Sequence, residues 1–190
     1  MKKCLVLAIL FALAFMALAP AGVAVADSES HTYQLHMEHP NVSEASNGDR
    51  VAVTGGGTFS THPDSVTASG TFTHTNASGA LMASGTWIAT DLIEFQPYGC
   101  GVLVYTDPDT TLPPNFCGGA LKLRVHLTAT APASIAGLQA DGILTIFCII
   151  GPNPPNNHDD PTGEGISLVV QGIINFNKIV SGMNVYIKTS

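Results

Sequence analysis

Two groups of side chains in this sequence are of the types that bind metal ions or transfer protons. His158, Asp159 and Asp160 precede Glu164 in a proline-rich stretch, and calcium takes carboxylate oxygens from loops of this kind. The spacing lacks the Asp-x-Asp-x-Asp-Gly pattern of the common calcium loop. A solvated acidic loop is therefore the simpler interpretation. We therefore expect no cofactor, with calcium at this loop as the alternative.

The second group contains three histidines, His31, His36 and His39, with Met37 between them. Imidazole and thioether ligands suit copper. On a strand, His36 and His39 face opposite sides, so a shared metal requires a turn, for which Pro40 is suitable. The simpler prediction is a solvated polar segment.

No catalytic motif accompanies these residues. The chain has no Gly-x-Ser-x-Gly elbow, no His-Glu-x-x-His pair and no phosphate-binding glycine loop before a helix. An enzyme built on this chain would have to bring the 158–164 loop and Asp107 or Asp109 together with His74 or His126. The sequence therefore favours a protein that is not an enzyme.

The elements that must position these residues are strands. A Gly-Thr-aromatic triplet occurs three times, and the residues around each triplet alternate between an apolar and a hydroxyl-bearing face, which predicts antiparallel strands at 51–59, 66–75 and 81–95. On the apolar face His74 and Asp91 are the two polar residues, and we expect them to lie far apart. The triplets are Gly57-Thr58-Phe59, Gly70-Thr71-Phe72 and Gly85-Thr86-Trp87.

Two four-residue loops, 62–65 and 76–79, set the predicted register of these strands. They align the three triplet glycines in one row across the sheet, and Phe59, Ala68 and Trp87 in the next row. A glycine row indicates a bend or a seat for a bulky side chain. Close approach of a ligand is the alternative.

The rest of the chain also predicts strands and no long helix. A two-layer antiparallel β-sandwich is the fold expected for the single domain 27–190, with a closed β-barrel as the alternative. Residues 121–130 alternate and predict a half-exposed strand, whereas 143–150 are apolar on both faces. Further strands are predicted at 32–37, 103–106, 166–170, 173–180 and 183–187.

The first 26 residues have the layout of a secretory signal peptide. Lys2 and Lys3 precede an apolar stretch, and Ala24-Val25-Ala26 forms a small-residue cleavage site. We therefore expect a protein of the extracellular space or cell envelope, without a membrane span after cleavage. The net charge of −7 and the absence of a basic stripe argue against nucleic-acid binding.

Three cysteines follow the signal segment, so one disulfide and one free thiol are expected. A Cys100–Cys117 bridge would close the proline-rich 101–116 loop and leave Cys148 buried in an apolar strand. A Cys117–Cys148 bridge is the alternative. Asn41 and Asn76 each begin an Asn-x-Ser glycosylation pattern, and their modification depends on the host.

These observations predict a secreted domain that acts by binding or assembly, with an extracellular ligand or protein as partner. The first alternative is a small secreted enzyme with its site at the loop ends of the β fold. The second is a fibre subunit that self-associates by strand addition, with residues 27–40 as the mobile donor segment.

Overall fold

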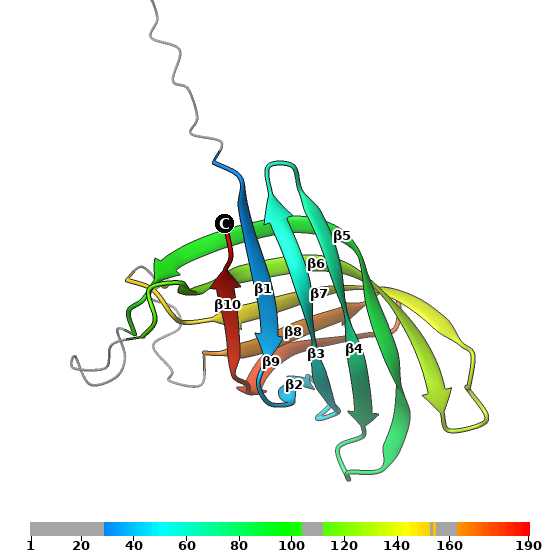
Figure 1. The fold of residues 1–190 in the computed structure, drawn as a ribbon. Helices are drawn as coiled ribbons and strands as arrows, with labels where there is room; N and C mark the ends of the chain where they lie inside the picture. The colour runs from blue at the N-terminus through cyan, green and yellow to red at the C-terminus, as the bar shows by residue number, and fades with distance from the viewer. Residues whose placement is uncertain (1–28, 104–111, 153, 155–162) are drawn as a thin grey trace, which may run out of the picture.

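The computed structural model describes residues 29–103, 112–152, 154 and 163–190. Over these residues the chain forms ten strands and no helix (Figure 1). No described segment is therefore a helix able to cross a membrane. The strands are β1 His31–Met37, β2 Asn41–Ala45, β3 Arg50–Thr61, β4 Ser65–Thr75, β5 Leu81–Cys100, β6 Phe116–Ala131, β7 Gln139–Cys148, β8 Gly165–Val170, β9 Ile174–Ser181 and β10 Asn184–Lys188.

All ten strands belong to one antiparallel sheet. Their order is β1-β10-β6-β5-β4-β3-β2-β9-β8-β7, and two further pairings join β1 to β3 and β6 to β7. The sheet curves around a single core, so its facing layers are parts of one hydrogen-bonded structure (Figure 1). The predicted all-β antiparallel fold is confirmed. Of the predicted strand 103–106, residues 104–106 lie outside the described part of the chain.

Strand β6 shows how the sequence pattern produces this core. Leu121, Leu123, Val125 and Leu127 are buried, whereas the residues between them, such as Arg124, are more exposed. Successive side chains of a strand point to opposite faces, so alternation buries one row and leaves the other in solvent. The half-exposed strand predicted here is confirmed.

Aromatic rings fill the centre of the core. Phe59 stacks on Tyr33 with ring centroids 5.0 Å apart, and Phe95 lies 4.8 Å from Phe59. Tyr186 packs edge-on against Phe59, and its hydroxyl donates a 2.8 Å hydrogen bond to the carbonyl oxygen of Ile146. A buried tyrosine hydroxyl needs such a partner. The rings therefore pack without leaving this hydroxyl unpaired.

The predicted strand register is wrong by two residues at both hairpins. Gly70 lies opposite Gly55 and Trp87, rather than opposite the two other triplet glycines. The first turn begins one residue earlier than predicted, because Ser60 pairs with Ser65 and His62 adopts a left-handed φ of 56°. A shift of two keeps every side chain on its predicted face. The residues that lie opposite each other on neighbouring strands therefore differ from the prediction, but Phe59, Phe72 and Trp87 still lie in one core.

The second half of β5 departs from simple alternation. Register shifts between Ala89 and Asp91 and between Leu92 and Glu94 mark irregularities such as β-bulges, in which one strand carries an extra residue. Leu92 is consequently the buried residue. Strict alternation from Trp87 predicts that Ile93 faces inward, and this prediction is wrong, since Ile93 is 38% exposed. Asp91 is exposed and pairs opposite Arg124. It is not a polar residue of the inner face.

Candidate functional site

A concave site lies where the β2–β3 and β8–β9 turns meet. We call it the turn groove; it is open to solvent and has a volume of about 470 Å³. The two turns come together because β2 pairs with β9, with Ala45 opposite Phe176. The groove is lined by Ala45, Ser46, Asn47, Val170, Gly172, Ile173, Ile174 and Asn175.

Short hydrogen-bonded turns hold both walls of the groove. In the β2–β3 turn the amide of Gly48 donates to the carbonyl of Ala45 (2.9 Å), and the amide of Asp49 donates to Asn47 Oδ1 (3.1 Å). In the β8–β9 turn the amide of Ile173 donates to the carbonyl of Val170 (3.1 Å). Both turns contain a glycine with a positive φ, as tight turns often require. The walls are thus built by local backbone geometry.

The lining of the turn groove carries no charged side chain. Ser46 and Asn175 make no side-chain hydrogen bond within the described residues, whereas the side chain of Asn47 is bonded to Asp49. Ile173 is 70% exposed beside these polar groups. The groove therefore offers hydroxyl and amide groups next to an apolar side chain, the combination that orients small ligands in many binding sites.

A histidine–carboxylate pair lies next to the turn groove. His74 Nε2 is 2.9 Å from Asp49 Oδ2, and the two side chains are 19% and 15% exposed. The imidazole packs edge-on against Phe176, with ring centroids 5.1 Å apart. The hydrogen bond from His74 lowers the pKa of Asp49 below its ordinary value, and a bond from Asn47 adds to this while burial opposes it. The carboxylate thus fixes the orientation of the ring.

The other histidine suggested for an enzymatic site lies elsewhere. His126 Nδ1 is 2.9 Å from Asp141 Oδ1, and both side chains are substantially exposed on the outer face of β6 and β7. Asp107 and Asp109 lie outside the described residues.

The acidic loop considered as a weak calcium candidate lies mostly outside the described residues, which include Glu164 but not His158, Asp159 or Asp160. Burial raises the pKa of Glu164 from its ordinary value of 4.5 to about 7, although a hydrogen bond from the backbone amide of Asn184 opposes this shift. Across the part of the chain that the structure describes, no three His, Cys, Asp or Glu side chains are placed to hold a metal ion.

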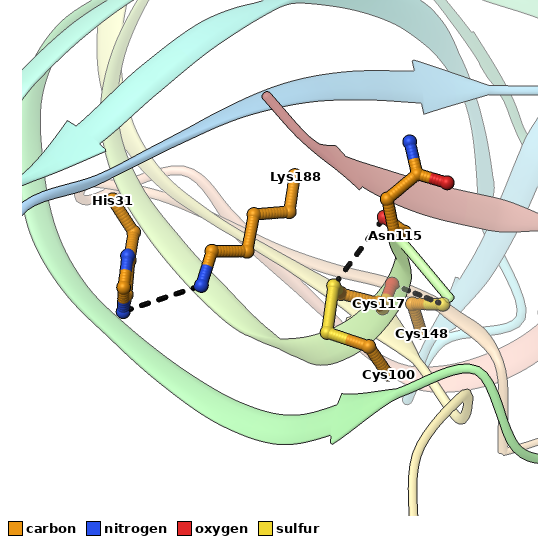
Figure 2. Close-up of a disulfide and its surroundings, with 6 residues drawn as sticks. All are labelled: His31, Cys100, Asn115, Cys117, Cys148 and Lys188. Carbon is orange, nitrogen blue, oxygen red and sulfur yellow. Dashed lines mark hydrogen bonds between the residues drawn. A yellow bond between two sulfur atoms is a disulfide. The ribbon is translucent and has the colours of Figure 1, made fainter. Parts of the chain in front are cut away.

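The N-terminal histidines are separated by the structure. His36 and His39 are exposed, whereas His31 lies partly buried on β1. His31 Nε2 is 3.5 Å from Lys188 Nζ (Figure 2) and 3.5 Å from a carboxylate oxygen of Glu29. His31 therefore contacts charged side chains and shares no metal geometry with the other two.

The Cys100–Cys117 disulfide is formed between the ends of β5 and β6, as the sequence predicted (Figure 2). Cys148 is buried and free, and its thiol donates to the carbonyl oxygen of Cys117 at 3.6 Å. Burial raises the pKa of this thiol far above its ordinary value, and the nearby Glu164 adds to the effect. Because the thiolate is the reactive form, Cys148 is a structural rather than a reactive cysteine.

The two glycosylation patterns differ in accessibility. Asn41 is 0% exposed, and its amide and that of Asn184 donate to each other at 3.0 and 2.9 Å. Asn76 lies in the β4–β5 turn, where its Oδ1 accepts hydrogen bonds from the amides of Ser78 and Ala80. A glycan on Asn41 is incompatible with this packing, whereas Asn76 lies at an accessible turn.

A narrow space lies in the central layer of the core. Seven core side chains surround a space too small for a water molecule: Val53, Phe72, Trp87, Val125, Leu127, Leu144 and Leu168.

Sequence reasoning did not identify the turn groove. The dipeptide Asn47-Gly48 is a recognisable turn signal. The groove also needs the 172–175 turn, which is far away in sequence and reaches Asn47 only through the pairing of β2 with β9. Comparison with known proteins adds no assignment: no family model, no curated protein and no solved structure matches the chain.

Proposed function

We propose that this protein is an exported, non-enzymatic β domain that binds an uncharged ligand in the turn groove. The observation that carries the proposal is the composition of the groove, in which free amide and hydroxyl groups lie beside the exposed side chain of Ile173. Its volume of about 470 Å³ is typical of small-molecule sites. A suitable ligand carries amide or hydroxyl groups next to an apolar group, as an N-acetylated sugar does.

Export is supported by two independent features. The first 26 residues have the charge, apolar stretch and small-residue site of a signal peptide. The Cys100–Cys117 disulfide is typical of an oxidising compartment. The ligand would therefore be met in the cell envelope or outside the cell.

The binding experiment uses isotope-labelled mature protein titrated with N-acetylglucosamine oligomers, followed by amide NMR. We expect shifts concentrated at residues 45–47 and 172–175. Ile173→Asp and Asn175→Asp should weaken binding, because each places a charge in an uncharged groove. Ile88→Asp is the matched control, since Ile88 is also an exposed isoleucine but lies on β5, outside the groove lining. Shifts centred elsewhere would contradict the proposal.

The His74–Asp49 pair favours a second candidate, general-base catalysis at the same groove. An oriented imidazole is the usual proton acceptor of such sites. The described residues show no hydroxyl or thiol hydrogen-bonded to His74, which is why binding is the preferred function. Hydrolysis of a neutral chromogenic acetate ester tests it: turnover that is abolished in His74→Asn would establish catalysis, and an equal rate in both proteins would exclude it.

A further inference from the structure

The pairing of β4 with β5 covers only part of each strand. It runs from Thr75 opposite Leu81 to Ser69 opposite Ile88 and ends there. Beyond that point β4 (65–68) pairs only with β3, and β5 (89–100) pairs only with β6. Two strand edges are consequently without a ladder partner among the described residues. Figure 1 shows the β3–β4 turn reaching past β5 at this place.

The two edges differ in how they are protected. The β5 edge has three register shifts and carries Asp91, Glu94 and Pro97. Bulges, charges and prolines are the features by which proteins prevent an edge from pairing with another chain. The β4 edge has none of them: the segment Ser-Val-Thr-Ala at 65–68 is uncharged, lacks proline and shows no register shift against β3.

We propose that the 65–68 edge of β4 pairs with the same edge of a second copy of this chain. An unpaired strand edge presents backbone N–H and C=O groups, and the partner that satisfies them is another extended segment. Antiparallel pairing of one edge with itself is compatible with two-fold symmetry, which is the commonest symmetry of homodimers. Because the segment is uncharged, self-pairing brings no like charges together.

The alternation of side chains restricts the register of this contact. Ala68 is buried in the core, whereas Thr67 is exposed on the outer face. Residues directly opposite each other in an antiparallel pair point to the same side. A register that places the two Thr67 residues opposite each other satisfies this requirement and sets Val66 beside Ala68 of the second copy. The outer hydroxyl face then continues across the dimer.

The edge is four residues long, so the association is expected to be weak and reversible. Small interfaces are typical of transient encounters. The N-terminal segment is not the donor in this arrangement, because β1 is already paired on one side with β3 and on the other with β10. The contact joins two complete domains rather than exchanging a segment between them.

Sedimentation velocity of the oxidised mature protein tests the proposal. Between micromolar and millimolar concentration, the wild-type average mass should rise from one copy toward two. Thr67→Lys should weaken the dimer by at least about tenfold, because two lysines would meet at the symmetry axis. Thr58→Lys is the matched control: Thr58 is exposed and lies opposite Thr67, but its strand has partners on both sides. It should dimerise like the wild type.

Charge reversal distinguishes pairing at this edge from a general effect of the substitution. Thr67→Glu alone should also be monomeric, whereas an equimolar mixture of Thr67→Lys and Thr67→Glu should recover the dimer mass. A wild-type protein that stays monomeric at millimolar concentration would overturn the proposal. So would a Thr67→Lys protein that dimerises normally, or a mixture that shows no recovery.

Discussion

The indole of Trp87 donates a 2.9 Å hydrogen bond from Nε1 to the carbonyl oxygen of Thr54. The ring reaches across β4 to do so, because Trp87 lies on β5 and Thr54 on β3. It lies over Gly55 and Gly70, where added Cβ atoms would be 2.5 Å and 2.7 Å from the ring. The glycines are thus a seat for a bulky side chain, one of the two structural interpretations of the glycine pattern.

Gly70→Ala should destabilise the protein by about 1–3 kcal/mol, because the new methyl group would collide with the Thr54 carbonyl oxygen and the indole. Urea unfolding measures the change. Ser69→Ala, one residue earlier on the exposed face, is the control and should change the free energy of unfolding by no more than about 0.5 kcal/mol. Equal effects of the two substitutions would show that the seat is unimportant.

The sequence was sufficient to predict the faces of the strands but not their register. Side-chain alternation has a period of two, so an error of two residues leaves every face unchanged. The loop boundaries decide which residues lie opposite each other, and the left-handed residue of the first turn is His62 rather than a glycine. In β5 the register shifts also break the alternation, which is why Leu92 replaced Ile93 in the core.

The candidate site was less accessible to sequence reasoning. Its two walls are joined by the pairing of Ala45 with Phe176, residues that are distant in the chain. The Asp49 partner of His74 was also missed, because Asp49 precedes β3 and reaches the ring only after β3 pairs with β4. Local patterns identify turns and strands, whereas this site depends on which strands become neighbours. The cysteine pairing was easier, since the bridge joins the ends of two consecutive strands.

Removing the disulfide should lower the free energy of unfolding by about 3 kcal/mol, the value expected for a cross-link that closes a loop of this length. The double variant Cys100→Ala/Cys117→Ala, compared with the wild type in urea, measures it. A reducing agent should destabilise the wild type by a similar amount and leave the double variant unchanged. If the reductant affects both proteins equally, the effect does not come from this bond.

The reciprocal amide pair of Asn41 and Asn184 should be strongly coupled. The Nδ2 of Asn184 also lies within hydrogen-bonding distance of the carbonyl oxygens of Phe147 and Gly165, so Asn184→Ala removes the hydrogen bonds that this amide donates in the interior. We expect a loss of at least about 3 kcal/mol of stability.

A double-mutant cycle with Asn41→Ala measures the coupling in that pair. Once one of the two amides has been removed, removing the other should lower the free energy of unfolding by less than it does in the wild type. The expected coupling energy is about 1–3 kcal/mol. Strictly additive losses would show that the two amides contribute independently.

Stability should depend on pH through Glu164. Its pKa is raised by burial from 4.5 to about 7, so the folded protein binds this proton more tightly than the unfolded chain does. The stabilisation by the protonated form is therefore complete below pH 4.5, decreases as pH rises, and is lost above about pH 7.

Glu164→Gln removes this titration but keeps the shape of the side chain. The difference in unfolding free energy between wild type and variant should consequently change between pH 4.5 and pH 7 and remain constant above that interval. Asp49 and Glu44 have lowered pKa values, titrate below this range and are present in both proteins. Urea unfolding at several pH values gives the two curves. Parallel curves would mean that Glu164 titrates alike in the folded and unfolded chains, and that its burial next to Asn184 does not oppose ionisation.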